Sequence, residues 1–253
     1  MESVQSYLVC GVQNSGSSVL CDALKNTQIA GIPEEYFLIW EEGWWAQNHN
    51  LLSRQSYLDI VLEKGYTPNG VFGGKILWHY FKDMMEKVRA LPSYKNMDDT
   101  SIMAQLFHNP KYIWIVRRDK VQQAIDWAIA AQTGVHNAQH RSLNDLEFDY
   151  TLIDNLHRLI EFGEQGWTNY FEHAHVTPLT IVYEDFVSNY NQSIKSILTY
   201  LDIDTTTSKE VLTKAPQTLT QSTSYQNDWR TRYWKIRELQ TNQWVFSING
   251  SRP

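Results

Sequence analysis

The chain has 253 residues, a net charge of −6 at pH 7 and two cysteines, Cys10 and Cys21. The length suits one α/β domain, the charge argues against a nucleic-acid-binding surface, and two cysteines give no disulfide framework. The sequence has no signal-peptide pattern, and no apolar run approaches the roughly 20 residues of a membrane span, so we expect a cytoplasmic protein that binds neither membranes nor nucleic acid.

Short, continuously apolar runs alternate with amphipathic stretches, which is typical of an α/β fold with a central, mainly parallel sheet flanked by helices. We expect strands over residues 7–11, 71–77, 112–116 and 179–183. We expect helices over residues 17–26, 56–64, 79–90, 119–133, 150–173 and 193–201, where apolar residues recur at helical spacing. We take 1–253 as a single domain with the first strand in the centre of the sheet and a polar tail from residue 205.

The most informative segment is the turn that joins the first strand to the first helix, residues 11–18. A strand, a Gly/Ser turn and a helix in that order bring backbone N–H groups and the positive end of the helix dipole to one point, which favours an anion. Gly11 and Gly16 have the spacing of an NTPase P-loop, but Ser17 stands where that motif has lysine. We therefore predict a turn that binds one phosphate and is unsuited to ATP or GTP hydrolysis. The alternative is a helix start with an ordinary N-cap.

Arg117 is the first charged residue after the strand at 112–116. Ligand sites of parallel α/β sheets lie beyond the carboxyl ends of the strands, so we expect Arg117 to face the same crevice as the turn. Its guanidinium suits a second phosphate, bound bidentately. For Arg118 we expect only a surface ion pair with Asp119, which contributes little.

Three further side chains are candidates for acid–base or electrostatic roles. Glu35 follows the first helix. A carboxylate near an anion site is sensible if it takes a proton from an acceptor hydroxyl. A solvated surface residue is the simpler interpretation of Glu35. Gly73 and Gly74 inside a strand indicate a bulge or the close approach of a ligand or backbone. Lys75 then points into the crevice and neutralises charge on a transferring group, or is merely an edge-strand lysine. His79 is a second candidate base.

The sequence offers little support for other kinds of catalytic site. His173 and His175 form the only tight pair of possible metal ligands, and no cysteine or carboxylate cluster has ligand spacing, so we expect no metal. No G-x-S-x-G motif supports a Ser/His/Asp triad, and no G-x-G-x-x-G motif supports a dinucleotide site.

Four segments, taken together, resemble the bacterial trehalose 2-sulfotransferase family. Their order and spacing match along most of the chain, which is far more specific than any single motif. The segments are residues 6–37, with Gln-Asn-Ser-Gly-Ser-Ser at 13–18 and Pro-Glu-Glu-Tyr-Phe at 33–37; residues 67–78, with Gly-Gly-Lys at 73–75; residues 117–135; and residues 228–233, Asp-Trp-Arg-Thr-Arg-Tyr.

The resemblance implies a P-loop-like sulfotransferase fold with a helical C-terminal part, a homodimer, and 3′-phosphoadenosine-5′-phosphosulfate (PAPS) as the donor. The reaction would be in-line transfer of a sulfonyl group to an acceptor oxygen or nitrogen, without a metal. Residue by residue, it implies that Asn14, Ser15, Gly16, Ser17 and Ser18 bind the 5′-phosphosulfate, Arg117 the 3′-phosphate and Arg230 the nucleotide, and that Glu35 is the general base and Lys75 the strand lysine.

Two residues depart from the family pattern. Asn14 stands where the family has a basic residue that stabilises the bridging oxygen of the donor, and losing such a donor costs roughly 3 kcal/mol. Asp126 falls near the family's phosphate-binding serine, where a carboxylate would repel a 3′-phosphate. Either Lys75 and other cations compensate, or the protein is a catalytically impaired nucleotide- or ligand-binding member of the same fold.

The acceptor stays open between two chemical classes. The family's known case is a sugar, trehalose, but fold and donor do not determine the acceptor. Residues 40–45, Trp-Glu-Glu-Gly-Trp-Trp, are acidic and rich in tryptophan, which also suits a cationic natural product of secondary metabolism such as a guanidinium alkaloid. The alternative is that these rings pack in the core or in a dimer.

Overall fold

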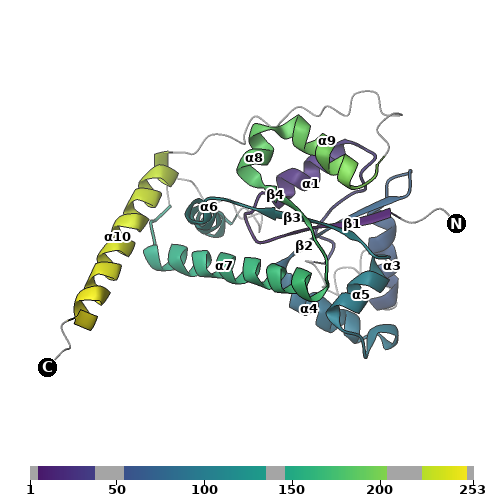
Figure 1. Cartoon of the computed structure of the whole chain (residues 1–253), viewed down its shortest axis with the longest axis horizontal. Coiled ribbons are helices and arrows are strands. Elements are labelled where there is room, and N and C mark those ends of the chain that lie inside the picture. Colours follow the sequence, from purple (N-terminus) through teal and green to yellow (C-terminus); the bar gives the residue numbers. More distant parts are fainter. Residues whose placement is uncertain (1–4, 38–53, 135–145, 204–223, 250–253) are drawn as a thin grey trace. The chain divides into compact units, whose positions relative to one another are not determined.

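A computed structural model describes residues 5–37, 54–134, 146–203 and 224–249, whose elements are labelled in Figure 1. The chain divides into two compact units. Unit 1 comprises Met1–Arg118 and Gly163–Pro216, and unit 2 comprises Asp119–Phe162 and Gln217–Pro253. That residues 1–253 form a single domain stays a prediction.

Unit 1 contains a parallel sheet, in agreement with the predicted α/β class. Its described strands are β1 (Gln5–Gly11), β2 (Val71–Leu77), β3 (Lys111–Val116) and β4 (Leu179–Val182), in the order β2-β1-β3-β4. All three pairings are parallel, and β1 is an inner strand, as predicted. The carboxyl ends of β1, β2 and β3 therefore lie at one edge of the sheet, together with that of β4.

Helices cover both faces of this sheet because successive side chains of a strand point to opposite faces. Tyr7 and Val9 pack in one apolar cluster, while Leu8 and Cys10 pack in the other. The face with Tyr7 and Val9 carries α1 (Ser17–Asn26), α8 (Tyr183–Ser188) and α9 (Tyr190–Tyr200) (Figure 1). The face with Leu8 and Cys10 carries α3 (Arg54–Lys64), α4 (Trp78–Arg89), α5 (Asp99–Leu106) and the last turns of α7 (Tyr150–His173). The short 3-10 helix η1 (Pro92–Tyr94) follows α4.

Unit 2 is helical in its described part, which agrees with the predicted helical C-terminal part. It consists of α6 (Lys120–Thr133), the first turns of α7, and α10 (Ser224–Asn249). Trp229 and Tyr233 of α10 are buried, and the Tyr233 hydroxyl donates to the buried carboxylate of Asp154 on α7 at 2.9 Å. Aromatic packing and a buried hydrogen bond thus attach α10 to α7 within this unit.

Three of the described α-helices were not among the expected elements. The helix α5 begins at an N-cap, Asp98, whose side chain accepts from the Ser101 N–H at 2.8 Å. Tyr183, expected to end the last strand, instead begins α8. The segment of α10 was expected to be part of a polar tail, because charged and polar residues separate its aromatic side chains along the sequence. Within the described ranges, no helix combines the length and apolarity that a membrane crossing requires.

Candidate functional site

The turn between β1 and α1 has a left-handed backbone and no capping side chain. Asn14 has φ 57°, and Gly16, the N-cap residue of α1, has φ 91°. Gly16 has no side chain that could accept a hydrogen bond from the first turn of α1, and no side-chain cap hydrogen bond forms at this N-cap position. A helix start of this kind presents backbone N–H groups to an anionic acceptor.

Two side chains of the turn carry buried polar atoms that lack a hydrogen-bond partner among the described residues. These atoms are Asn14 Nδ2 and Ser15 Oγ, and Ser15 is only 1% exposed. Ser17 is also buried, whereas Ser18 is exposed. A buried polar group without a partner costs about 1–3 kcal/mol. Phosphate or sulfonate oxygens in the turn would remove this cost, so the turn fits the donor that the family resemblance implies.

Lys75 reaches the turn from the neighbouring strand β2. Its ammonium nitrogen donates to Ser18 Oγ at 3.1 Å and lies 3.1 Å from Glu35 Oε2. Although β2 is an edge strand of the described sheet, the Lys75 side chain is only 8% exposed. Lys75 is therefore an edge-strand lysine, as one of the two interpretations held, but its ammonium is enclosed between the turn and a carboxylate.

The segment before Glu35 lies directly along β2, which explains why Lys75 is covered. Glu34 forms a parallel bridge with Gly74, and the Glu34 carbonyl accepts from the Lys75 N–H at 3.0 Å. A Cβ on Gly31, which has φ 71°, would lie 2.4 Å from the Gly73 nitrogen. The close backbone approach predicted from the two glycines of the strand is thus confirmed, and a side chain would prevent it.

This pairing brings Glu35 to Lys75 and leaves Glu34 at the surface. The Glu35 side chain is 24% exposed, and its second oxygen, Oε1, is buried without a hydrogen-bond partner among the described residues. Glu34, by contrast, is 46% exposed and pairs with the equally exposed Lys25. The interpretation of Glu35 as a solvated surface residue is therefore wrong. Its Oε1 is positioned to accept a hydrogen bond from a ligand.

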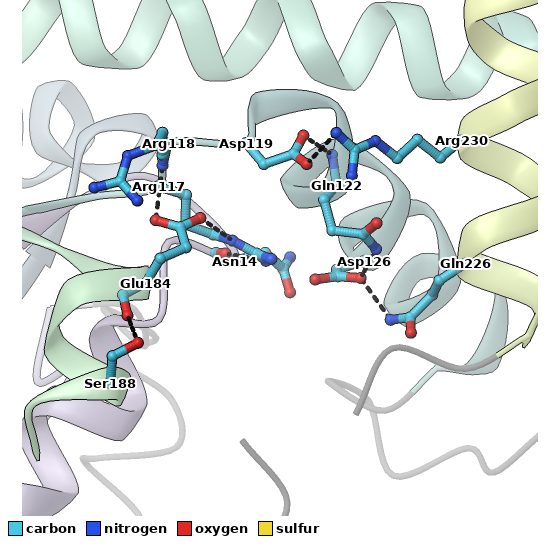
Figure 2. Close-up of polar contacts among 10 residues, drawn as sticks. All are labelled: Asn14, Arg117, Arg118, Asp119, Gln122, Asp126, Glu184, Ser188, Gln226 and Arg230. Carbon is cyan, nitrogen blue, oxygen red and sulfur yellow. Dashed lines mark hydrogen bonds and ion pairs between the residues drawn. The ribbon is translucent and has the colours of Figure 1, made fainter. Parts of the chain in front are cut away.

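Arg117 contacts the turn from the carboxyl end of β3. Its Nη1 donates to the Asn14 carbonyl at 3.4 Å, and its Nε lies 3.9 Å from Glu184 Oε1 (Figure 2). The guanidinium also lies over the ring of Tyr183, 5.1 Å from the ring centroid. Arg117 therefore faces the turn, as expected from the strand order.

Arg118 differs from the prediction in its partner. The expected ion pair with Asp119 is wrong, because Arg118 Nη2 instead donates to Asp185 Oδ2 at 2.7 Å. The backbone N–H of Arg118 donates to Glu184 Oε2 at 2.9 Å (Figure 2). Both side chains of the pair are more than half exposed, so the pair contributes little to stability, as expected of a surface ion pair.

His79, the second candidate base, is half-buried near the start of α4. A Cβ on Gly163 would lie 3.3 Å from its ring, so the imidazole packs closely on α7. Burial lowers the pKa of His79 because it disfavours the charged imidazolium. The ring is therefore neutral at pH 7 and able to accept a proton, and the choice between Glu35 and His79 rests on contacts with a substrate.

Within unit 2, Arg230 and Asp126 have partners that the sequence did not reveal. Arg230 Nη2 lies 2.9 Å from Asp119 Oδ2, and the same Asp119 side chain caps α6 by accepting from the Gln122 N–H at 3.0 Å. Asp126 Oδ1 accepts from the amides of Gln122 at 2.9 Å and Gln226 at 2.7 Å (Figure 2). Two amide dipoles thus disperse part of the Asp126 charge.

Tyr183 and Glu184 are the site residues that sequence reasoning missed. They follow β4 directly, as Arg117 follows β3, so the rule that located Arg117 also applied to them. The acidic, tryptophan-rich segment at 40–45 lies outside the described residues. Within the described ranges, no group of three or more histidine, cysteine or carboxylate side chains could hold a metal ion.

Comparison with known proteins adds an independent line of evidence. The model of a family described as Stf0 sulphotransferase matches residues 6–236. A trehalose 2-sulfotransferase of Mycolicibacterium smegmatis is 26% identical over 226 residues, which cover 79% of this chain and 85% of the relative. A trehalose 2-sulfotransferase of Mycobacterium tuberculosis is 26% identical over 258 residues, which cover 91% of this chain and 95% of the relative.

Proposed function

Because this chain belongs to the Stf0 sulphotransferase family, we propose that it transfers a sulfonyl group from PAPS to a hydroxyl of a small polar acceptor, such as a sugar. The observation that supports this most directly is the buried ammonium of Lys75, 3.1 Å from both Ser18 of the turn and Glu35. A cation at this point offsets charge on a leaving phosphate, and a carboxylate beside it accepts the proton of the attacking hydroxyl.

The turn would bind the phosphosulfate end of the donor. Asn14 Nδ2 and Ser15 Oγ, which are buried without partners in the described part of the chain, would donate to its oxygens, together with backbone N–H groups at Gly16 and Ser17. Bound there, the donor supplies an activated sulfonyl group, whose S–O bond to the phosphate breaks as an S–O bond to the acceptor forms. Lys75 would supply the positive charge that Asn14 does not.

Arg117 would bind the 3′-phosphate. Its contacts with the Asn14 carbonyl and Glu184 are long, at 3.4 and 3.9 Å, and a phosphate would replace or supplement these two contacts. That Arg230 contacts the nucleotide stays a prediction. Such a contact would compete with the ion pair between Arg230 and Asp119.

Glu35 would act as the general base through Oε1. The other oxygen, Oε2, is paired with Lys75, which orients the carboxylate. An acceptor hydroxyl that donates to Oε1 would satisfy the Glu35 oxygen that lacks a partner among the described residues. As the acceptor oxygen bonds to sulfur, its proton moves to Oε1, and the neighbouring ammonium limits the charge that accumulates.

A sugar hydroxyl is the acceptor class that the comparisons favour, because the two relatives are named trehalose 2-sulfotransferases. A cationic acceptor, suggested by the composition of residues 40–45, is the competing possibility. The expected homodimer stays a prediction. Turnover of a panel of sugars and guanidinium compounds with ³⁵S-labelled PAPS would distinguish the two acceptor classes.

Two observations favour a second candidate function, a nucleotide- or ligand-binding protein without sulfonyl transfer. Asn14 carries no charge at the reacting end of the turn, and Asp126 carries a carboxylate on the helix that follows Arg117. Measurable transfer to any acceptor would exclude this function.

Isothermal titration with the product nucleotide, 3′-phosphoadenosine-5′-phosphate (3′,5′-ADP), tests the donor assignment. We expect a saturable interaction that adenosine does not show, because the phosphate groups make the proposed contacts. An absence of binding at high micromolar concentrations would reject PAPS as the donor. Binding without transfer across the whole acceptor panel would favour the second candidate function.

A further inference from the structure

Tyr183 contacts two separate parts of the proposed donor site, Arg117 and the turn at Gly16. It follows Val182 of β4, which is paired with Val116 of β3, so Tyr183 and Arg117 leave the sheet at neighbouring positions. The Arg117 guanidinium lies over the ring, 5.1 Å from its centroid. A planar cation at this distance is attracted to the electron-rich face of the ring.

The same ring lies against Gly16 in the turn. A Cβ on Gly16 would lie 2.1 Å from Cδ2 and 2.6 Å from Cε2 of Tyr183, far inside van der Waals contact. The ring therefore occupies the space that a side chain at position 16 would need. Tyr183 thus determines how the Arg117 guanidinium lies relative to the anion-binding turn.

Two further contacts restrict the direction of the Arg117 side chain. Nη1 donates to the Asn14 carbonyl at 3.4 Å, and Nε lies 3.9 Å from Glu184 Oε1 (Figure 2). Neither contact has the short, bidentate geometry of a strong Arg–carboxylate pair. The Tyr183 ring supports the flat face of the guanidinium, and the nitrogens that donate hydrogen bonds lie along the edge of that group.

We infer that Tyr183 is a positioning residue that orients Arg117 toward the 3′-phosphate of the donor nucleotide. This inference rests on the proposed function, because it assumes that Arg117 binds that phosphate. It predicts that Tyr183 contributes to affinity only for nucleotides that carry a 3′-phosphate. A purely structural tyrosine would instead affect all nucleotides alike, through the turn.

The experiment measures binding of 3′,5′-ADP and of 5′-AMP, which lacks the 3′-phosphate, to the wild-type chain and to variants at residue 183. Tyr183→Phe keeps the ring and should bind both nucleotides within about twofold of wild type. Tyr183→Leu should weaken 3′,5′-ADP by about 5- to 30-fold, the range of a partly buried cation–π contact, and leave 5′-AMP within about twofold. In an Arg117→Met background, Tyr183→Leu should have no further effect on 3′,5′-ADP.

A second series keeps the shape of the ring in case Tyr183→Leu does not fold. Phenylalanines carrying one, two or three ring fluorines at position 183 weaken the negative face of the ring stepwise. We expect affinity for 3′,5′-ADP to fall with each fluorine, at constant affinity for 5′-AMP.

The possible failures are distinguishable. If the wild-type chain binds no 3′,5′-ADP, the proposed function fails and this inference with it. If the wild-type chain binds 3′,5′-ADP but the variants weaken both nucleotides equally, or neither, only the positioning role of Tyr183 is rejected.

Discussion

Lys75 and Glu35 form an ion pair with 3.1 Å between Nζ and Oε2, and their side chains are 8% and 24% exposed. The adjacent residue Glu34 pairs with Lys25, but there both side chains are nearly half exposed. The two pairs have the same chemistry and opposite environments. A charge enclosed by protein interacts more strongly with a reacting group than a solvated one, so the two pairs provide a matched comparison.

Lys75→Met should lower kcat about 10²- to 10³-fold, the usual effect of removing a preorganised group that stabilises developing charge. The matched control is Lys25→Met, which removes the exposed ammonium and should leave kcat within about twofold. Steady-state turnover with labelled PAPS measures both variants. Equal losses in the two variants would contradict a special role for Lys75.

Glu35→Gln should lower kcat about 10²- to 10⁴-fold, because glutamine cannot accept the proton of the acceptor hydroxyl. Binding of 3′,5′-ADP should persist, since no proposed donor contact involves Glu35. Glu34→Gln is the control at the exposed neighbour. If Glu35→Gln keeps full turnover while His79→Gln loses it, His79 is the base instead.

Gly16→Ala should destabilise the protein more than Gly70→Ala, although both glycines have positive φ, at 91° and 80°. A Cβ at Gly16 would overlap the Tyr183 ring, whereas a Cβ at Gly70 meets nothing within 4 Å. Backbone strain alone costs about 1 kcal/mol, and overpacking adds about 1–3 kcal/mol. Urea unfolding of both variants measures the difference in the free energy of unfolding, and similar values would contradict the contact.

Stability should depend on pH through His79, whose pKa burial lowers. Because the unfolded chain then binds the proton more readily than the folded one, the contribution to stability is complete above the unfolded value, near pH 6.5. It is lost progressively as the pH falls below that value toward the folded pKa. Urea unfolding between pH 5 and 7.5 should show a smaller loss of stability on acidification for His79→Gln than for the wild-type chain.

Tyr233→Phe should destabilise the helical unit by about 1–3 kcal/mol, because it removes the hydroxyl that donates to buried Asp154 at 2.9 Å. Burial, followed by this hydrogen bond, raises the pKa of Tyr233 to about 12, so the hydroxyl keeps its proton at neutral pH. Tyr150→Phe, which removes an exposed bond to Gln240, should cost less than about 0.5 kcal/mol. Hydrogen exchange of the α10 amides should accelerate only in Tyr233→Phe.

Local patterns determined much of the fold and part of the candidate site. The apolar runs predicted all four described strands, and the glycines at 73 and 74 predicted the close backbone approach that the segment containing Glu34 makes. Helix α10 was missed because charged and polar residues separate its aromatic side chains along the sequence, and α8 was missed because Tyr183 continues an apolar strand run. Both helices bury side chains against segments distant in the sequence: Phe186 of α8 and Tyr233 of α10 are each at most 1% exposed.

The sequence by itself determined that a glycine- and serine-rich turn joins the first strand to a helix, because such a turn depends on glycine conformation and on a helix start a few residues away. It also determined family membership, through motifs whose order and spacing are properties of the chain alone. Only the tertiary structure decided which carboxylate pairs with Lys75 and which ring supports Arg117. Those relationships follow from the register of parallel strands and from segments that approach across long stretches of chain, and no local pattern specifies them.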